Sequence, residues 1–403
     1  MQTWLSGEIK KHESINDFIA NLHEFRARES SKLDERKVLE SFKYCLESLN
    51  VLDLISENEN ISFTPTDSLK PDFVLYAPET QSVVIVEVKN IANPTRQAGT
   101  EVSAYANEIK TYIPFISDGD IINVIVSTVW PTLLCHYIFH EIFWQQRNIL
   151  CLQPVKIKGE IQLEIIDIKK IAQDSLSLKL ATEHLAGYQI CLYDDQLNTK
   201  FTNRARLDAY IPQMNAAMSA MASKANAQKN HGFAFLWKDG REITLAPYNI
   251  TLINFSAFQS FERHFHNSDF EPNEIAKRFI RIIRDHDPSG HGNSLNQITA
   301  YGEAFLKGFC SPKPEGFLSW EYLREYMLEN NRSLLQFKVW GVFEEIYSEK
   351  LLLSYQNGEN DLEFEDPYLG VRFINELIDP KYGFIALSNY EDEDEDNDED
   401  ENG

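Results

Sequence analysis

The sequence predicts an α/β protein of two domains, or three, whose first domain has a mixed central sheet covered by helices. Three observations lead to this prediction. The chain has 403 residues, more than one ordinary hydrophobic core accommodates. Segments with apolar residues at helical spacing alternate with short β-branched runs. Two of these runs, 83–88 and 121–128, are typical of strands buried inside a sheet.

The first domain is expected to span residues 1–154, and its elements follow from hydrophobic period and turn residues. The segment 95–112 is delimited as a helix, because Asn93-Pro94 precedes it and Pro114 ends it. The predicted helices are 17–28, 34–49, 95–112 and 132–146, and the predicted strands are 51–55, 61–65, 73–76, 83–88, 121–128 and 148–152. Strands in this order with intervening helices predict a mixed sheet covered on both faces.

Residues 155–390 read as a second α/β or α+β domain, with a role in recognition, regulation or oligomerisation. Its predicted helices are 204–229, 273–285 and 320–351, and its predicted strands are 233–237, 243–245 and 251–255. The remainder, 391–403, is expected to be a disordered acidic tail, because 391–401 holds ten acids in eleven residues.

Composition excludes several classes of protein. The net charge is −24 and the chain stays acidic without its tail, which argues against a protein that simply coats nucleic acid. The five cysteines are odd in number and form no Cys-x-x-Cys pair, so we expect reduced, buried thiols and no structural zinc. No apolar run reaches about 18 residues and the first residues do not resemble a signal peptide, so we expect a cytoplasmic protein without membrane contact.

A charged pair ends the apolar strand Val83–Lys89. Strand alternation places Glu87 and Lys89 on one face of the sheet, together with Val83 and Ile85. Burying such ions without partners costs several kcal/mol, on the order expected for desolvated charges. A metal ion bound to the carboxylate removes this cost.

A second carboxylate lies upstream, in Pro71-Asp72, where a turn enters the strand 73–76. Fourteen residues separate Asp72 from Glu87, enough for one strand, a turn and an antiparallel partner. In that hairpin both carboxylates reach the same end of neighbouring strands. With the Val88 carbonyl they form half of an oxygen shell suited to Mg²⁺ or Mn²⁺.

The pattern Pro71-Asp72 … Glu87-Val88-Lys89 resembles the PD-(D/E)xK, or restriction-endonuclease-like, nucleases over residues 30–153. The resemblance implies a restriction-endonuclease-like core. It implies that Asp72 and Glu87 bind the metal and that Lys89 positions or activates the attacking water and stabilises the transition state. These roles agree with the chemistry of a metal acting as a Lewis acid beside a fixed cation.

Two further features of the family have candidates here. Many members carry a glutamate on the helix before the sheet; Glu40 is the best candidate for this third acid and Glu35 the alternative. Members also often carry Gln-x-x-x-Tyr on the helix after the Glu-x-Lys strand. Gln97, Glu101 and Tyr105 share one face of that helix, with Glu101 in the place of the glutamine. We take Gln97 and Tyr105 as candidate substrate contacts, and this substitution leaves open whether the face touches DNA or supports Lys89.

The sequence therefore predicts a Mg²⁺- or Mn²⁺-dependent nuclease that hydrolyses nucleic acid, DNA rather than RNA, and a bacterial defence effector is one role for it by analogy. The alternative is a catalytically inactive nucleic-acid-binding or scaffolding protein on the same fold. A protein partner through the second domain and a homo-oligomer are both open. Lys277, Arg281 and Arg284 share a helix stripe that either follows a phosphate backbone or is a solvated face with local ion pairs.

Overall fold

The structure, a computed structural model, describes residues 1–64, 68–89, 97–172, 180, 182–197, 205–256, 273–286 and 292–378. The chain divides into two compact units, Met1–Ser177 and Leu178–Gly403. The boundary predicted after residue 154 falls inside a strand, Ile149–Ile157, so the structure places it further along the chain. The predicted tail, 391–403, lies outside the described residues.

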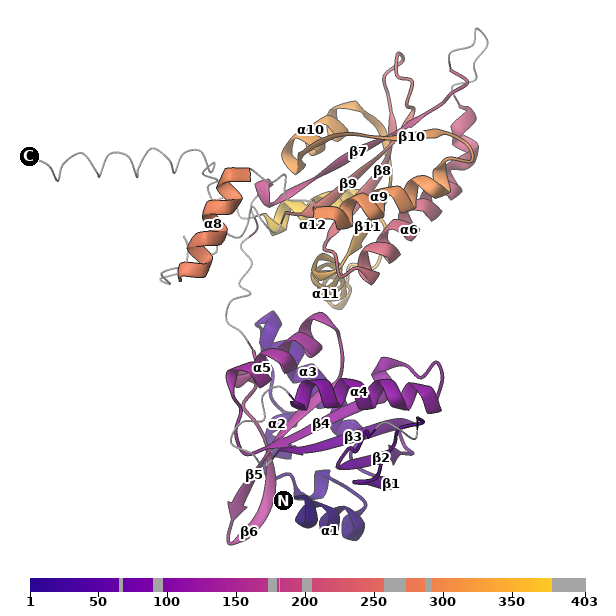
Figure 1. Cartoon of the computed structure of the whole chain (residues 1–403). Coiled ribbons are helices and arrows are strands. Elements are labelled where there is room, and N and C mark those ends of the chain that lie inside the picture. Colours follow the sequence, from indigo (N-terminus) through magenta and orange to yellow (C-terminus); the bar gives the residue numbers. More distant parts are fainter. Residues whose placement is uncertain are drawn as a thin grey trace, which may run out of the picture. The chain divides into compact units, whose positions relative to one another are not determined.

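The first unit holds a six-stranded sheet in the order β1-β2-β3-β4-β5-β6 (Figure 1). The strands are β1 (Asp53–Glu57), β2 (Phe73–Ala77), β3 (Ser82–Lys89), β4 (Ile121–Ser127), β5 (Ile149–Ile157) and β6 (Glu160–Ile165). Strand β4 lies parallel to both β3 and β5, and the other neighbouring strands pair antiparallel. The mixed sheet predicted from the sequence is confirmed.

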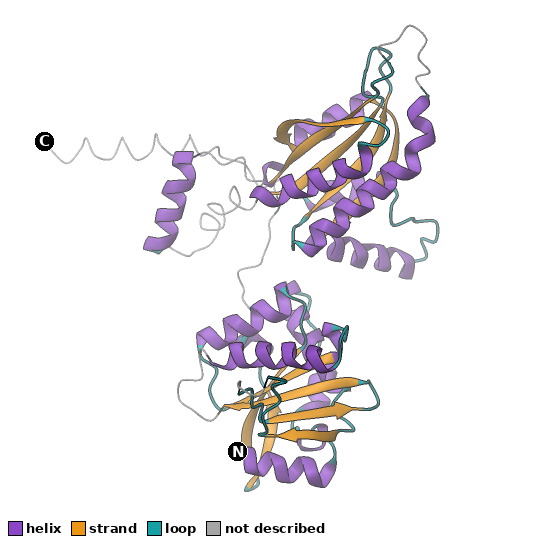
Figure 2. Ribbon diagram, turned by 45° about the vertical axis from the view of Figure 1, so that its right-hand side comes forward, coloured by secondary structure: helices purple, strands orange, loops and turns teal. Residues whose placement is uncertain are grey.

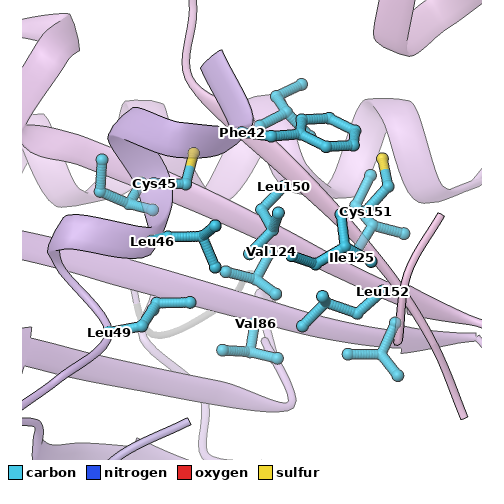
Figure 3. Packing of buried hydrophobic residues seen from close by; sticks show 14 of the residues in the cluster. Phe42, Cys45, Leu46, Leu49, Val86, Val124, Ile125, Leu150, Cys151 and Leu152 are labelled. Carbon is cyan, nitrogen blue, oxygen red and sulfur yellow. The ribbon is translucent and has the colours of Figure 1, made fainter. Parts of the chain in front are cut away.

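Helices cover both faces of this sheet. They are α1 (Gln2–His12), α2 (Leu22–Arg26), α3 (Leu33–Glu47), α4 (Gln97–Tyr112) and α5 (Thr132–Phe139), the last followed by a π-helical turn at His140–Trp144. The apolar stripe of α3, which includes Phe42 and Leu46, faces Val124 and Leu150 of the sheet (Figure 3). Helix α4 contributes Tyr105 to a separate apolar cluster on the sheet.

The side chains of β3 alternate between these two layers. Val84 and Val86 belong to the core that α3 joins, whereas Val83 and Ile85 pack in the cluster with α4. This is the two-residue period of a strand that is buried on both faces. Any side chain at an odd-numbered position of β3 therefore lies on the α4 face.

The second unit holds a five-stranded antiparallel sheet in the order β10-β7-β9-β8-β11, with helices on both faces (Figure 2). The strands are β7 (Leu185–Tyr193), β8 (Gly232–Asp239), β9 (Tyr248–Phe255), β10 (Ser311–Ser319) and β11 (Asn331–Trp340). The helices are α6 (Ile211–Ala227), α8 (Glu274–His286), α9 (Gly292–Leu306), α10 (Trp320–Asn330), α11 (Val342–Gln356) and α12 (Pro367–Leu377). Helices α6 and α9 pack on one face, and α10, α11 and α12 on the other.

The sequence misassigned several segments. The helix predicted over 320–351 is two helices separated by β11, whose pairing with β8 overrides a sequence that fits either element. The segment 243–245 is a turn, residues 61–64 form no strand, and 17–28 is a 3₁₀ turn at Asn16–Phe18 followed by α2. Helices α1, α9 and α12 and the strands β6, β7 and β10 were not predicted.

All five cysteines are buried and free, as expected from their number and spacing: Cys45, Cys135, Cys151, Cys191 and Cys310. Burial raises the pKa of each of these thiols above its ordinary value. In the described part of the chain, no helix has the length and apolar character needed to cross a bilayer.

Close approach of two strands in the second sheet gives a test of its register. A Cβ atom added to Gly187 of β7 would lie 1.8 Å from the main-chain oxygen of Leu252 on β9. Gly187→Ala should therefore lower the free energy of unfolding by about 2–3 kcal/mol or more, as overpacking does. Gly308→Ala is the matched control, because its Cβ meets nothing within 4 Å. Equal urea unfolding midpoints for the two variants would contradict this packing.

Candidate active site

The hairpin of β2 and β3 brings the predicted acidic residues together. Phe73 pairs with Val86, so the residue before Phe73 and the residue after Val86, Asp72 and Glu87, lie side by side at one end of the hairpin. Both side chains fall on the face that α4 covers, as does Lys89 two residues after Glu87. The hairpin and the face inferred from spacing and alternation are thus present.

Hydrogen bonds join this end of β3 to α4. The Val88 N–H donates to Asp72 Oδ2 at 2.6 Å, and Lys89 Nζ donates to Glu87 Oε1 at 2.7 Å. Lys89 Nζ also donates to Glu101 Oε2 of α4. A lysine ammonium therefore connects one carboxylate of the strand to one of the helix. We call Asp72, Glu87, Lys89 and Glu101 the acidic cluster.

Burial sets the electrostatics of the acidic cluster. Glu87 is only 6% exposed, and its Oε2 is buried without a hydrogen-bond partner. Burial, together with the charges of Asp72 and Glu101, raises the pKa of Glu87 to about 7 despite the hydrogen bond from Lys89. Burial also raises the pKa of Asp72, against the effect of the Val88 N–H.

Lys89 stays charged in this setting. Burial alone would favour its neutral amine, but the hydrogen bonds to Glu101 and Glu87 prevail and raise the pKa of Lys89 above its ordinary value. The charges of Glu87, Glu101 and Asp72 also add to burial in raising the pKa of Tyr105. The electrostatic influence of all three carboxylates at Tyr105 places this side chain beside the acidic cluster.

Helix α4 contributes Glu101 to the acidic cluster. Glu101, at the glutamine position of the expected Gln-x-x-x-Tyr pattern, accepts a hydrogen bond from Lys89 Nζ. Tyr105, one turn further on, is 5% exposed and donates its hydroxyl to the Lys70 carbonyl oxygen at 3.1 Å. Tyr105 therefore fixes the chain just before Asp72. The side chain of Gln97 lies outside the described part of the structure.

The third acid predicted on α3 does not join the acidic cluster. The Glu40 side chain is 67% exposed, and its Oε1 lies 4.0 Å from Arg36 Nε. Its alternative, Glu35, is buried but accepts a hydrogen bond from Ser30 Oγ at 2.8 Å. Helix α3 packs on the face of β3 opposite to α4, and so α3 does not direct these residues toward Asp72.

The donor atoms fit a hard divalent cation in part. Among the described residues, no group of three or more His, Cys, Asp or Glu side chains is arranged to hold a metal. The cluster instead offers two neighbouring carboxylates, and the unpartnered Glu87 Oε2 is a buried oxygen that lacks a cation or a donor. Carboxylate and main-chain oxygens are the ligands that Mg²⁺ and Mn²⁺ prefer.

The basic stripe of the second unit lies on α8. Lys277 is exposed and its Nζ pairs with Glu274 Oε1 at 3.2 Å, as on a solvated helix face. Arg281 is exposed, and the side chain of Arg284 lies outside the described residues. The apolar residues Ile275 and Ile282 of this helix are each 56% exposed.

Comparison with known proteins adds no relative to this description. No protein-family model, no curated protein and no solved structure matches the chain. The functional interpretation therefore depends on the geometry and electrostatics of the acidic cluster.

The raised pKa of Glu87 predicts a pH-dependent stability. The ordinary pKa of 4.5 becomes about 7 on folding, so between these values the folded protein binds a proton that the unfolded chain has released. The free energy of unfolding therefore falls as the pH rises through this interval. Glu87→Gln has no such proton. The free energy of unfolding of Glu87→Gln minus that of the unchanged protein should therefore rise by on the order of 3 kcal/mol as the pH increases across this interval.

Urea unfolding without divalent metal, from about pH 4.5 to about pH 8, measures this difference. Glu40→Gln is the control, because Glu40 is exposed on α3 and should show no comparable trend. A stability difference between Glu87→Gln and the unchanged protein that is the same at every pH would refute the raised pKa.

Proposed function

We propose that this protein is a Mg²⁺- or Mn²⁺-dependent nuclease whose active site is built on Asp72, Glu87 and Lys89. One observation supports this most directly. The buried carboxylate of Glu87, the half-buried carboxylate of Asp72 and a charged lysine meet on one face of a sheet, and Glu87 Oε2 has no hydrogen-bond partner. A carboxylate oxygen in this position is available to a divalent cation.

The chain order of the first unit supports the same proposal. A helix, three antiparallel strands, a second helix and a strand parallel to the third follow one another as α3, β1, β2, β3, α4 and β4. This agrees with the order expected for the restriction-endonuclease-like core that the Pro71-Asp72 … Glu87-Val88-Lys89 pattern implies. We therefore assign the core to that fold as part of the proposal.

Asp72, Glu87 and the Val88 carbonyl would hold the metal. In a strand, the N–H and C=O of one residue point to the same side. The Val88 N–H points to Asp72, so the Val88 carbonyl also faces the end of β2. The pairing of β2 with β3 stops there, at Phe73. When bound there, Mg²⁺ would polarise the scissile phosphate and lower the pKa of a bound water.

Lys89 and Tyr105 have different parts in this reaction. The charged Lys89 orients the attacking water and stabilises the negative charge that develops on the phosphate. Tyr105 is buried and its hydroxyl is bonded to the Lys70 carbonyl, so it positions Asp72 rather than contacting the substrate. The exposed side chain of Lys70 is then a candidate contact for the phosphate backbone.

The second candidate function is binding or scaffolding without catalysis. One observation favours it: the Lys89 ammonium already neutralises part of the acidic cluster. In either case the second unit would serve recognition, regulation or oligomerisation. DNA as the preferred substrate and a role in defence remain part of the proposal.

Cleavage of a supercoiled plasmid tests the function. With Mg²⁺ or Mn²⁺ the protein should nick DNA, and a chelator should stop it. Asp72→Ala removes a metal ligand and Lys89→Ala removes the cation beside the phosphate, so each should slow cleavage at least about 100-fold. Labelled single-stranded DNA and RNA in the same assay measure the substrate preference.

Glu40→Ala is the matched control, since it removes an exposed carboxylate that lies outside the acidic cluster. Its cleavage rate should equal that of the unchanged protein. Binding of DNA without cleavage in either metal would favour the scaffolding alternative. Cleavage by folded Asp72→Ala and Lys89→Ala at the full rate would end the catalytic assignment.

A further inference from the structure

Lys89 has two acidic partners, and the metal site needs one of them. Lys89 Nζ lies 2.7 Å from Glu87 Oε1 and also bonds to Glu101 Oε2. The side chains of Glu87 and Lys89 are 7% and 13% exposed, and that of Glu101 is 31% exposed. The ammonium therefore bridges a deeply buried carboxylate and one that is nearer to solvent.

We infer that Glu101 is a positioning residue that retains the Lys89 ammonium when Glu87 turns to the metal, so that the metal and Lys89 compete for Glu87. The inference rests on the proposed metal site and adds a role for a residue on α4. Glu101 would act through Lys89, without touching the metal or the substrate.

Burying an ammonium without a partner is costly. With little access to water, Lys89 needs an anionic partner at all times. A divalent cation on Glu87 repels the ammonium on the neighbouring oxygen of the same carboxylate, over a distance at which like charges interact strongly. Lys89 must then rely on its other partner, and that partner is Glu101.

Contacts of α4 with the rest of the unit fix the position of Glu101. It lies on α4, whose residue Val102 is buried in the core and whose Tyr105 is fixed by the Lys70 carbonyl. Without the Glu101 carboxylate, Lys89 would keep only Glu87 among the partners described, and the metal would have to displace it. The loss of Glu101 should therefore weaken metal binding chiefly through Lys89.

A competing explanation is that Glu101 attracts the metal directly, as any nearby negative charge would. A double-mutant cycle separates the two explanations, because it measures the part of one residue's effect that depends on another. The cycle consists of the full chain, Glu101→Gln, Lys89→Met and the double variant. Mn²⁺ binding by titration calorimetry is the readout, and it does not depend on cleavage.

We expect Glu101→Gln to weaken Mn²⁺ binding about tenfold, a typical coupling between contacting charges. Lys89→Met removes the competitor and should strengthen binding. In the Lys89→Met background, Glu101→Gln should change the Kd by less than about threefold, because its route of action is gone. Glu108→Gln is the matched control on the same helix, since Glu108 accepts its hydrogen bond from the Phe63 N–H and should leave the Kd unchanged.

Three results would overturn the inference, and circular dichroism must first show that each variant is folded. An unchanged Kd in Glu101→Gln would show that Glu101 has no part in metal binding. An equal effect of Glu101→Gln in both backgrounds would show direct attraction instead of positioning. No Mn²⁺ binding by the unchanged protein would remove the proposed metal site itself, and with it this role of Glu101.

Discussion

The central physical constraint in the first unit is the free-energy cost of keeping the Glu87 carboxylate away from water. The strand that carries it is apolar as far as Val86 and lies between β2 and β4, and Glu87 is only 6% exposed. One ammonium, from Lys89, offsets the charge only partly, since Asp72 and Glu101 also lie near it. The proposed metal ion would offset the charge on Glu87 that the ammonium leaves uncompensated.

The fold produces this arrangement through strand alternation and the two layers of helices. Alternation sends Glu87 and Lys89 to the layer of α4 and the even-numbered valines to the layer of α3. The parallel strand β4 covers the other edge of β3, which keeps the site in the middle of a sheet and not at a solvent-exposed border. Because α4 covers the face on which Glu87 and Lys89 lie, side chains of α4 can contact both residues.

The sequence was informative where local pattern determines structure. The β-branched run before Glu87 and its distance from Asp72 were enough to predict the hairpin and its shared face. Residues on α3 were harder, because a helical period does not reveal which face of the sheet the helix covers, and so Glu40 was misplaced. The bond from Lys89 to Glu101 joins a strand to a helix, and spacing within α4 alone could not select it. In the second unit, 331–340 fits both helical and strand patterns, and only its pairing with β8 decides.

The acidic cluster and Tyr105 all come from one stretch of about 34 residues, Asp72 to Tyr105, within a chain of 403. Closing so short a stretch costs little chain entropy, and the cost grows only slowly with length. The groups of the proposed reaction are therefore brought together mainly by contacts between residues that are close in the sequence. Replacement of the second unit would leave every residue of the acidic cluster, and the strands β2, β3 and β4 beside it, in place in the chain.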